Sequence, residues 1–113
     1  MSDWQAYEAG NTLGLTGVQG GTIMRDDAHE DGARITLERG CLRAPYAIIS
    51  SLYGMGDHTR FIADEPTANH AFDQMRAALT DILMRMPAED ADDYDAKFAA
   101  AEDAFAAFGE RYA

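Results

Sequence analysis

The sequence predicts a two-layer α+β domain in which two C-terminal antiparallel helices cover one face of a four-stranded antiparallel meander. Segments typical of strands fill residues 22–64, and residues 65–113 carry two long amphipathic helical patterns. Strands followed by helices in chain order are the signature of the α+β class. A length of 113 residues without internal repeats predicts a single domain over residues 1–113. The expected strands span about 22–28, 33–39, 44–53 and 58–63, and the expected helices about 65–86 and 90–112.

The first 21 residues are expected to form a short helical turn followed by a glycine-rich loop. Trp4 and Tyr7 lie three residues apart, a spacing that allows the two rings to pack together. Five glycines between residues 10 and 21 favour an irregular connection, because fixing a glycine backbone is entropically costly. We expect this loop to lie over the core, anchored by its apolar side chains Leu13, Leu15 and Val18.

The first two strands are expected to form a hairpin. Asp31-Gly32 between them is a strong signal for a two-residue turn, because both residue types tolerate positive φ. This turn places Ala28 opposite Ile35. It also leaves Asp26 opposite Leu37 on the apolar side, which argues against the register or marks a sheet edge.

The third and fourth strands form a second expected hairpin, in which the third is the most apolar strand and is therefore central. The segment 54–57 is expected to be a four-residue loop. Pairing across it places Tyr53 opposite His58 and Ser51 opposite Arg60. The helices would then cover the opposite face, which bears Tyr46, Ile48, Leu52 and Phe61.

Both helices are predicted from apolar stripes with a helical repeat. Asp64 provides a cap for the first helix, Pro66 lies near its first turn, and Pro87 ends it. Acidic residues at the start of the second helix stabilise it, because they interact favourably with the positive N-terminal end of the helix dipole. The first stripe contains Phe72, Met75, Leu79, Ile82, Leu83 and Met86, and the second contains Tyr94, Phe98, Ala101, Phe105, Phe108 and Tyr112.

The net charge of −11 is concentrated in the helical half of the chain. Residues 1–63 hold 8 acidic and 5 basic residues (−3), and residues 64–113 hold 12 acidic and 4 basic residues (−8). Such a surface repels phosphate backbones, so nucleic-acid binding is not expected. It suits a basic protein partner, although a solvated acidic face is the simpler interpretation.

The same composition predicts a cytoplasmic protein. No apolar run approaches the roughly 20 residues of a membrane helix, and the N-terminus lacks the features of a signal peptide. The single cysteine, Cys41, cannot form an internal disulfide, and a buried or incidental thiol is the simplest interpretation.

The best candidate site is the predicted open face of the sheet. The expected register gathers Tyr53, His58, Arg60 and Ser51 there, with Arg34 on the neighbouring strand. Two arginines, a tyrosine and a histidine together suit a carboxylate or phosphate ligand, and His58 and Tyr53 are plausible acid–base groups. The alternative is a half-solvated sheet face, which carries polar residues at alternate positions without any site.

No motif indicates a metal site or a cofactor. The acidic segment 26–31 matches no calcium-loop spacing, so we interpret it as a solvated hairpin tip. The glycine-rich segment 14–21 lacks the lysine, the preceding strand and the following helix of a phosphate-binding loop.

The leading functional hypothesis is a non-enzymatic module for protein interaction or self-association, because no catalytic set is assembled. A homodimer could form through the helices or through Ile49, Ile62 and Tyr53 on the sheet. The alternative hypothesis is a small-molecule-binding protein or small enzyme that uses Tyr53, His58 and Arg60 on the open face. A pocket over that face would favour the alternative, and an apolar patch would favour the interaction module.

Overall fold

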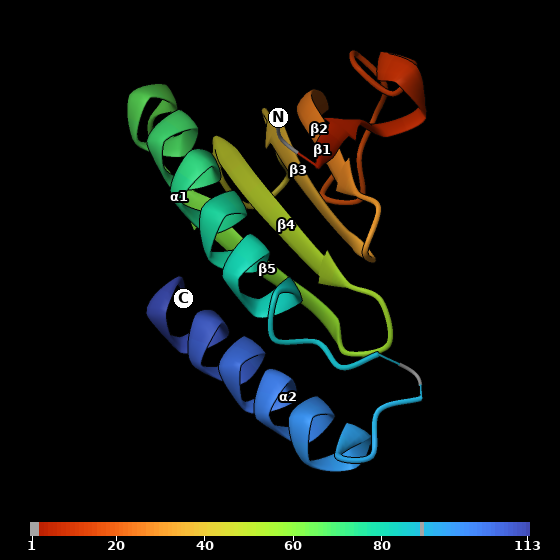
Figure 1. Ribbon diagram of the computed structural model, residues 1–113. Helices are drawn as coiled ribbons and strands as arrows, with labels where there is room; N and C mark the ends of the chain where they lie inside the picture. The colour runs from red at the N-terminus through yellow and green to blue at the C-terminus, as the bar shows by residue number, and fades with distance from the viewer. Residues whose placement is uncertain (1–2, 89) are drawn as a thin grey trace.

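The computed structural model describes residues 3–88 and 90–113, so the expectations for residues 1, 2 and 89 lie outside the described part. The chain forms a five-stranded antiparallel sheet with two helices on one face, which confirms the predicted α+β class with one strand more than expected (Figure 1). The strands are neighbours in chain order. They are β1 (Trp4–Ala6), β2 (Thr22–His29), β3 (Ala33–Arg39), β4 (Tyr46–Leu52) and β5 (Gly56–Ile62), and the helices are α1 (Glu65–Leu83) and α2 (Tyr94–Arg111).

The additional strand is β1, which adds to the edge of β2 where a helical turn was expected. The segment Tyr7–Gly10 makes a short turn with 3₁₀ hydrogen bonding, in which Glu8 and Ala9 have positive φ rather than the angles of a right-handed helix. Trp4 is paired with His29, and its indole Nε1 donates to Thr80 Oγ1 of α1 at 2.8 Å. The ring of Tyr7 lies instead against Arg34 on the other side of the sheet, so the expected Trp4–Tyr7 pair does not form. Three residues are too few for strand alternation to be recognised in a sequence.

The β2–β3 hairpin differs from the expected register by one residue. Ala28 is paired with Arg34 rather than Ile35, because the connection has three residues and ends at Gly32 with φ +109°. A shift of one residue turns every side chain to the other face. Asp26 therefore faces away from the helices, opposite Thr36, which removes the conflict that the predicted register contained.

The β4–β5 hairpin differs by three residues, which again exchanges the two faces. Gly56, with φ +122°, belongs to β5 and pairs with Leu52, so the turn is 53–55 rather than 54–57. His58 is consequently opposite Ser50, and Arg60 is opposite Ile48. The expected pairs of His58 with Tyr53 and of Arg60 with Ser51 were wrong.

The core lies between the sheet and α1. Asp64 caps α1 by accepting a hydrogen bond from the Thr67 amide at 2.9 Å, and proline occupies the first turn as predicted. Burying each large apolar side chain contributes about 1.5–3 kcal/mol. The helix ends at Leu83 rather than near residue 86, so Met86 of the predicted stripe lies beyond α1 and is half-buried. The rest of the stripe is buried and packs on Ala33, Ile35, Leu37, Ile48, Leu52 and Ile62. Phe61, which was expected in this core, lies on the other face.

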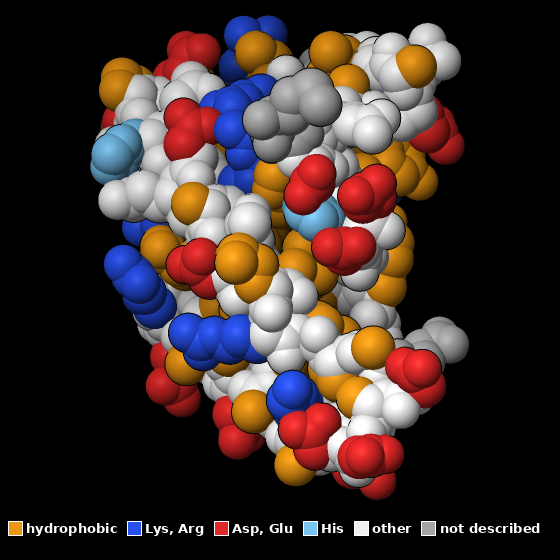
Figure 2. Space-filling model, viewed as in Figure 1, with side chains coloured by type: hydrophobic (Ala, Val, Ile, Leu, Met, Phe, Trp, Pro, Cys, Tyr) orange, Lys and Arg blue, Asp and Glu red, His pale blue; other side chains and the backbone are white. Residues whose placement is uncertain are grey.

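The second helix lies beside α1, beyond the edge strand β5 (Figure 1). It begins at Tyr94 rather than at residue 90, because the preceding acidic residues form turns. Ala101, Phe108 and Tyr112 of its stripe are buried, whereas the other three stripe residues are half-buried. Acidic side chains gather over this helix, which agrees with the charge of the helical half (Figure 2). Within the described residues, no helix is both long and apolar enough to cross a membrane.

Candidate functional site

The side of the sheet that faces away from the helices, here called the open face, carries two buried carboxylates. Asp26 projects from β2 and Glu38 from β3, and both residues are almost inaccessible to solvent. A carboxylate is costly to bury unless hydrogen bonds or a paired cation replace its water. The surroundings of these two groups therefore determine how the open face is built.

Asp26 accepts hydrogen bonds from three side chains. Arg34 donates to both carboxylate oxygens, from Nε at 2.9 Å and from Nη2 at 2.7 Å. The hydroxyls of Thr12 and Thr36 donate to Asp26 at 2.8 and 3.1 Å. A bidentate Arg–carboxylate pair with further hydrogen bonds is the arrangement in which a buried ion pair is best compensated. The contact with Thr12 also ties the N-terminal loop to the sheet.

Arg34 is fixed on both sides by this arrangement. Its guanidinium carbon lies 3.7 Å from the centre of the Tyr7 ring, within the range of a cation–π contact. The hydrogen bond and the charge of Asp26 raise the pKa of Arg34, against the opposing effect of its partial burial. A guanidinium held in this way keeps its charge and its orientation, which preorganises it for an anionic group.

Glu38 is held by backbone amides rather than by side chains. The Gln19 amide donates to Oε1 at 3.1 Å and to Oε2 at 3.3 Å, and the Gly21 amide donates to Oε1 at 3.0 Å. Gly17 packs directly on the carboxylate, since a Cβ placed on it would lie 2.2 Å from the Glu38 Cδ. These contacts require a glycine at position 17 and hold the loop 16–21 across the end of β3.

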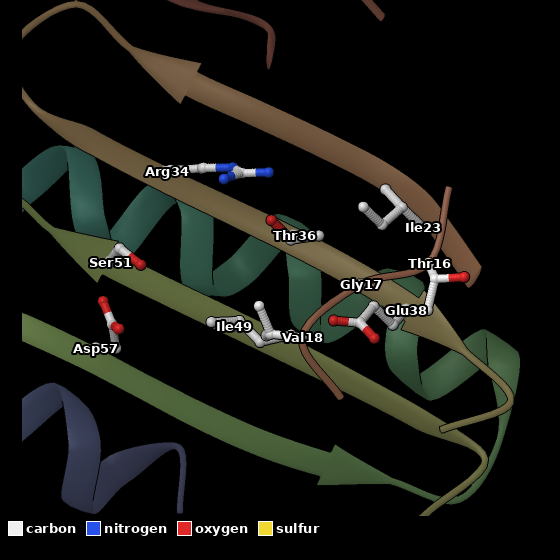
Figure 3. Close-up of a pocket in the computed structure, with 10 residues that line it drawn as sticks. All are labelled: Thr16, Gly17, Val18, Ile23, Arg34, Thr36, Glu38, Ile49, Ser51 and Asp57. Atoms are coloured by element: carbon white, nitrogen blue, oxygen red, sulfur yellow. The ribbon is translucent and has the colours of Figure 1, made fainter. Parts of the chain in front are cut away.

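The loop and the open face enclose a cavity of about 430 Å³ (Figure 3). The loop forms one wall and the strands β3, β4 and β5 form the floor. The floor is polar toward one end and apolar toward the other. Arg34, Thr36, Ser51 and Asp57 supply the polar groups, and Val18, Ile23 and Ile49 supply the apolar contacts.

Only two of the five predicted site residues line the cavity. Arg34 and Ser51 are directly paired across β3 and β4, and both line the cavity. Tyr53 lies exposed in the β4–β5 turn. His58 and Arg60 face the helices, because the register differs by an odd number of residues.

On the helix side, His58 and Arg60 serve the packing of α2. The His58 Nε2 donates to the carbonyl oxygen of Tyr112 at 2.8 Å, and its ring meets Phe108 edge-on with centroids 5.8 Å apart. The Arg60 guanidinium carbon lies 5.7 Å from the Tyr112 ring centre. An acid–base pair of His58 and Tyr53 on the open face is therefore not formed.

Sequence reasoning missed Asp57 as part of the site, and it missed the burial of Glu38. Asp57 was assigned to a loop, although it is paired with Ser51 inside the sheet. The conformational freedom of Gly56 was the available signal, since a glycine next to a short turn commonly marks a strand irregularity. The donors of Glu38 are main-chain amides, which leave no mark in a pattern of side chains.

Cys41 lies close to this region without being an activated nucleophile. Partial burial, and secondly the negative charge of Glu38, raise the pKa of its thiol. A raised pKa lowers the thiolate fraction at neutral pH. Across residues 3–88 and 90–113, no group of three or more His, Cys, Asp or Glu side chains is arranged to hold a metal ion.

The loop was expected to be anchored by Leu13, Leu15 and Val18, and this expectation was wrong. All three side chains are exposed. The anchors are polar instead: the Thr12 hydroxyl on Asp26, the two amides on Glu38, and the backbone hydrogen bonds that join Gly14 and Leu15 to Ile23 of β2.

Comparisons of the chain with protein-family models, with curated proteins and with solved structures find no match.

From the burial of the Asp26–Arg34 pair, we expect two conservative substitutions to differ strongly in their effect on the free energy of unfolding. Asp26→Asn removes a fully buried charge that Arg34 requires, so we expect the free energy of unfolding to fall on the order of 3 kcal/mol. Asp73→Asn breaks the Arg25–Asp73 ion pair, in which the Asp73 side chain is 58% exposed, and should cost less than about 1 kcal/mol. Urea denaturation of both variants measures the difference. Equal effects would show that the buried pair does not organise the open face.

Proposed function

We propose that this chain is a binding protein for a small molecule, which occupies the cavity on the open face. The observation that carries the proposal is the cavity itself. Its volume of about 430 Å³ lies within the range of about 300–1,000 Å³ that is usual for small-molecule sites. Apolar walls with a few fixed polar groups are also typical of such sites.

The rigidity of the cavity supports this proposal. A preorganised site loses little conformational freedom on binding, so more of the contact energy appears as affinity. The wall is attached through Glu38, and the most polar part of the floor is fixed through Asp26 and Tyr7. Solvated polar residues on a plain sheet face need no such support.

A substitution that fills the cavity tests the proposed function. Ser51→Phe places an aromatic ring over the floor, and Ala106→Phe places the same ring on an exposed position of α2. Small molecules of varied charge are screened by two-dimensional NMR of the amide groups. We expect ligands to shift resonances of β3, β4 and β5. Ser51→Phe should lower the affinity for these ligands at least tenfold, whereas Ala106→Phe should leave the affinity unchanged. The proposal fails if no compound shifts these resonances, or if both variants bind like the parent chain.

A second candidate function is self-association, favoured by an apolar patch beside the cavity. Val18 and Leu42 are 83% and 88% exposed, and Phe61 is 42% exposed. All three border a shallow depression between the loop and β5. Exposed apolar side chains that adjoin one another are more typical of interfaces than of isolated surface residues. A basic protein partner for the acidic helical half stays a prediction from the charge distribution.

Light scattering over a range of protein concentrations tests the second candidate. If the patch joins two copies, the mass approaches that of a dimer, and Leu42→Glu returns it to a monomer because two buried charges would face an apolar surface. Met84→Glu is the matched control, since Met84 is 80% exposed at the end of α1. A monomer at every concentration, or equal effects of the two variants, would contradict self-association through this patch.

A further inference from the structure

The floor of the cavity carries opposite charges on either side of a hydroxyl. Arg34, Ser51 and Asp57 are direct neighbours on β3, β4 and β5, and all three point to the open face. In Figure 3, Ser51 and Asp57 are turned toward each other, and Arg34 lies above β3. A cation and an anion thus stand on the outer two of three adjacent strands.

Both charged groups retain binding capacity. A guanidinium has five N–H donors, of which two are bound by Asp26, and within the described residues no acceptor for the other three is found. Asp57 is exposed, and it forms no ion pair with another described residue. The Ser51 hydroxyl between them can both donate and accept.

The charges are too far apart for a ligand whose own charges are adjacent. Neighbouring strands lie about 4.7–4.9 Å apart, which separates the backbones of β3 and β5 by about 10 Å. The guanidinium of Arg34 also leans toward Asp26 on β2, away from Asp57. A carboxylate and an ammonium carried on one carbon, as in a single amino acid, cannot contact both groups. An extended dipeptide, which spans about 7 Å, has the required length.

The remaining floor provides an apolar contact. Ile49 lies two residues from Ser51 on the same face of β4, and Val18 and Ile23 complete this end of the cavity. Glu38 also lies at this end, but its carboxylate already accepts the loop amides. The apolar end therefore favours an aliphatic group rather than a second charge.

We propose that the cavity binds a zwitterion of dipeptide length that carries an aliphatic side chain. This inference rests on the proposed small-molecule function and specifies its ligand class. The ligand carboxylate binds Arg34, its ammonium group binds Asp57, and its backbone passes Ser51. The aliphatic side chain packs on Ile49 and Val18.

Calorimetric titration with alanyl-leucine tests the ligand class. Three related probes remove one feature each: N-acetyl-alanyl-leucine lacks the ammonium, alanyl-leucine amide lacks the carboxylate, and leucine alone lacks the length. We expect each of them to bind at least tenfold more weakly than alanyl-leucine.

The variant Asp57→Asn assigns the ammonium contact without disturbing the buried pair of Asp26 and Arg34. This variant should bind alanyl-leucine at least tenfold more weakly than the parent chain, and it should bind the acetylated probe with unchanged affinity. Asp95→Asn, on the exposed side of α2, should change neither. Equal binding of the four probes, or an unchanged affinity in Asp57→Asn, would overturn the zwitterion proposal.

The outcomes separate this inference from the function on which it rests. If none of the four probes binds, but other compounds bind in the cavity and lose their affinity in the Ser51→Phe variant, the ligand class is wrong and the proposed function stands. If no compound of any charge occupies the cavity, both proposals fail.

Discussion

The open face of this sheet depends on the burial of two carboxylates. Neither Asp26 nor Glu38 is accessible enough to be hydrated, so each must obtain its hydrogen bonds from the protein. Half of the donor groups come from outside the sheet, namely the Thr12 hydroxyl and the Gln19 and Gly21 amides. Together with the backbone hydrogen bonds that join Gly14 and Leu15 to Ile23 of β2, this requirement holds the loop after β1 against the sheet, although its exposed leucines contribute little to the attachment.

The two sides of the sheet are consequently stabilised by different forces. On the helix side, apolar side chains of β3, β4 and α1 exclude water, and the hydrophobic effect provides most of the free energy. On the open side, specific polar contacts attach a loop that has few apolar anchors. Because polar contacts are directional, the loop stands over the strands in one position and leaves a cavity beside it. This division explains how a chain of this size can be stable and still keep a hollow surface.

The sequence was sufficient for the class and for the elements from β2 to α2, but not for β1 or for the faces of the sheet. The stripes of α1 and α2 and the cap at Asp64 were predicted correctly, because they depend on local periodicity and local hydrogen bonds. The registers were wrong because Gly32 and Gly56 adopt positive φ and alter the turn lengths. An odd shift moved His58 and Arg60 out of the site and brought Asp57 in. The position of Asp26 in the predicted β2–β3 register was a sign of this error, since an acidic residue on a predicted apolar face indicates a wrong register.

Amide hydrogen exchange measures whether the loop is attached through Glu38. The Gln19 and Gly21 amides lie in a surface loop, yet both donate to a buried carboxylate. We therefore expect their exchange to be slowed to within about tenfold of the β3 amides, since exchange requires the structure to open. Exchange of both amides at the rate of an unstructured peptide would contradict the account, because the wall of the cavity would then not be held in place.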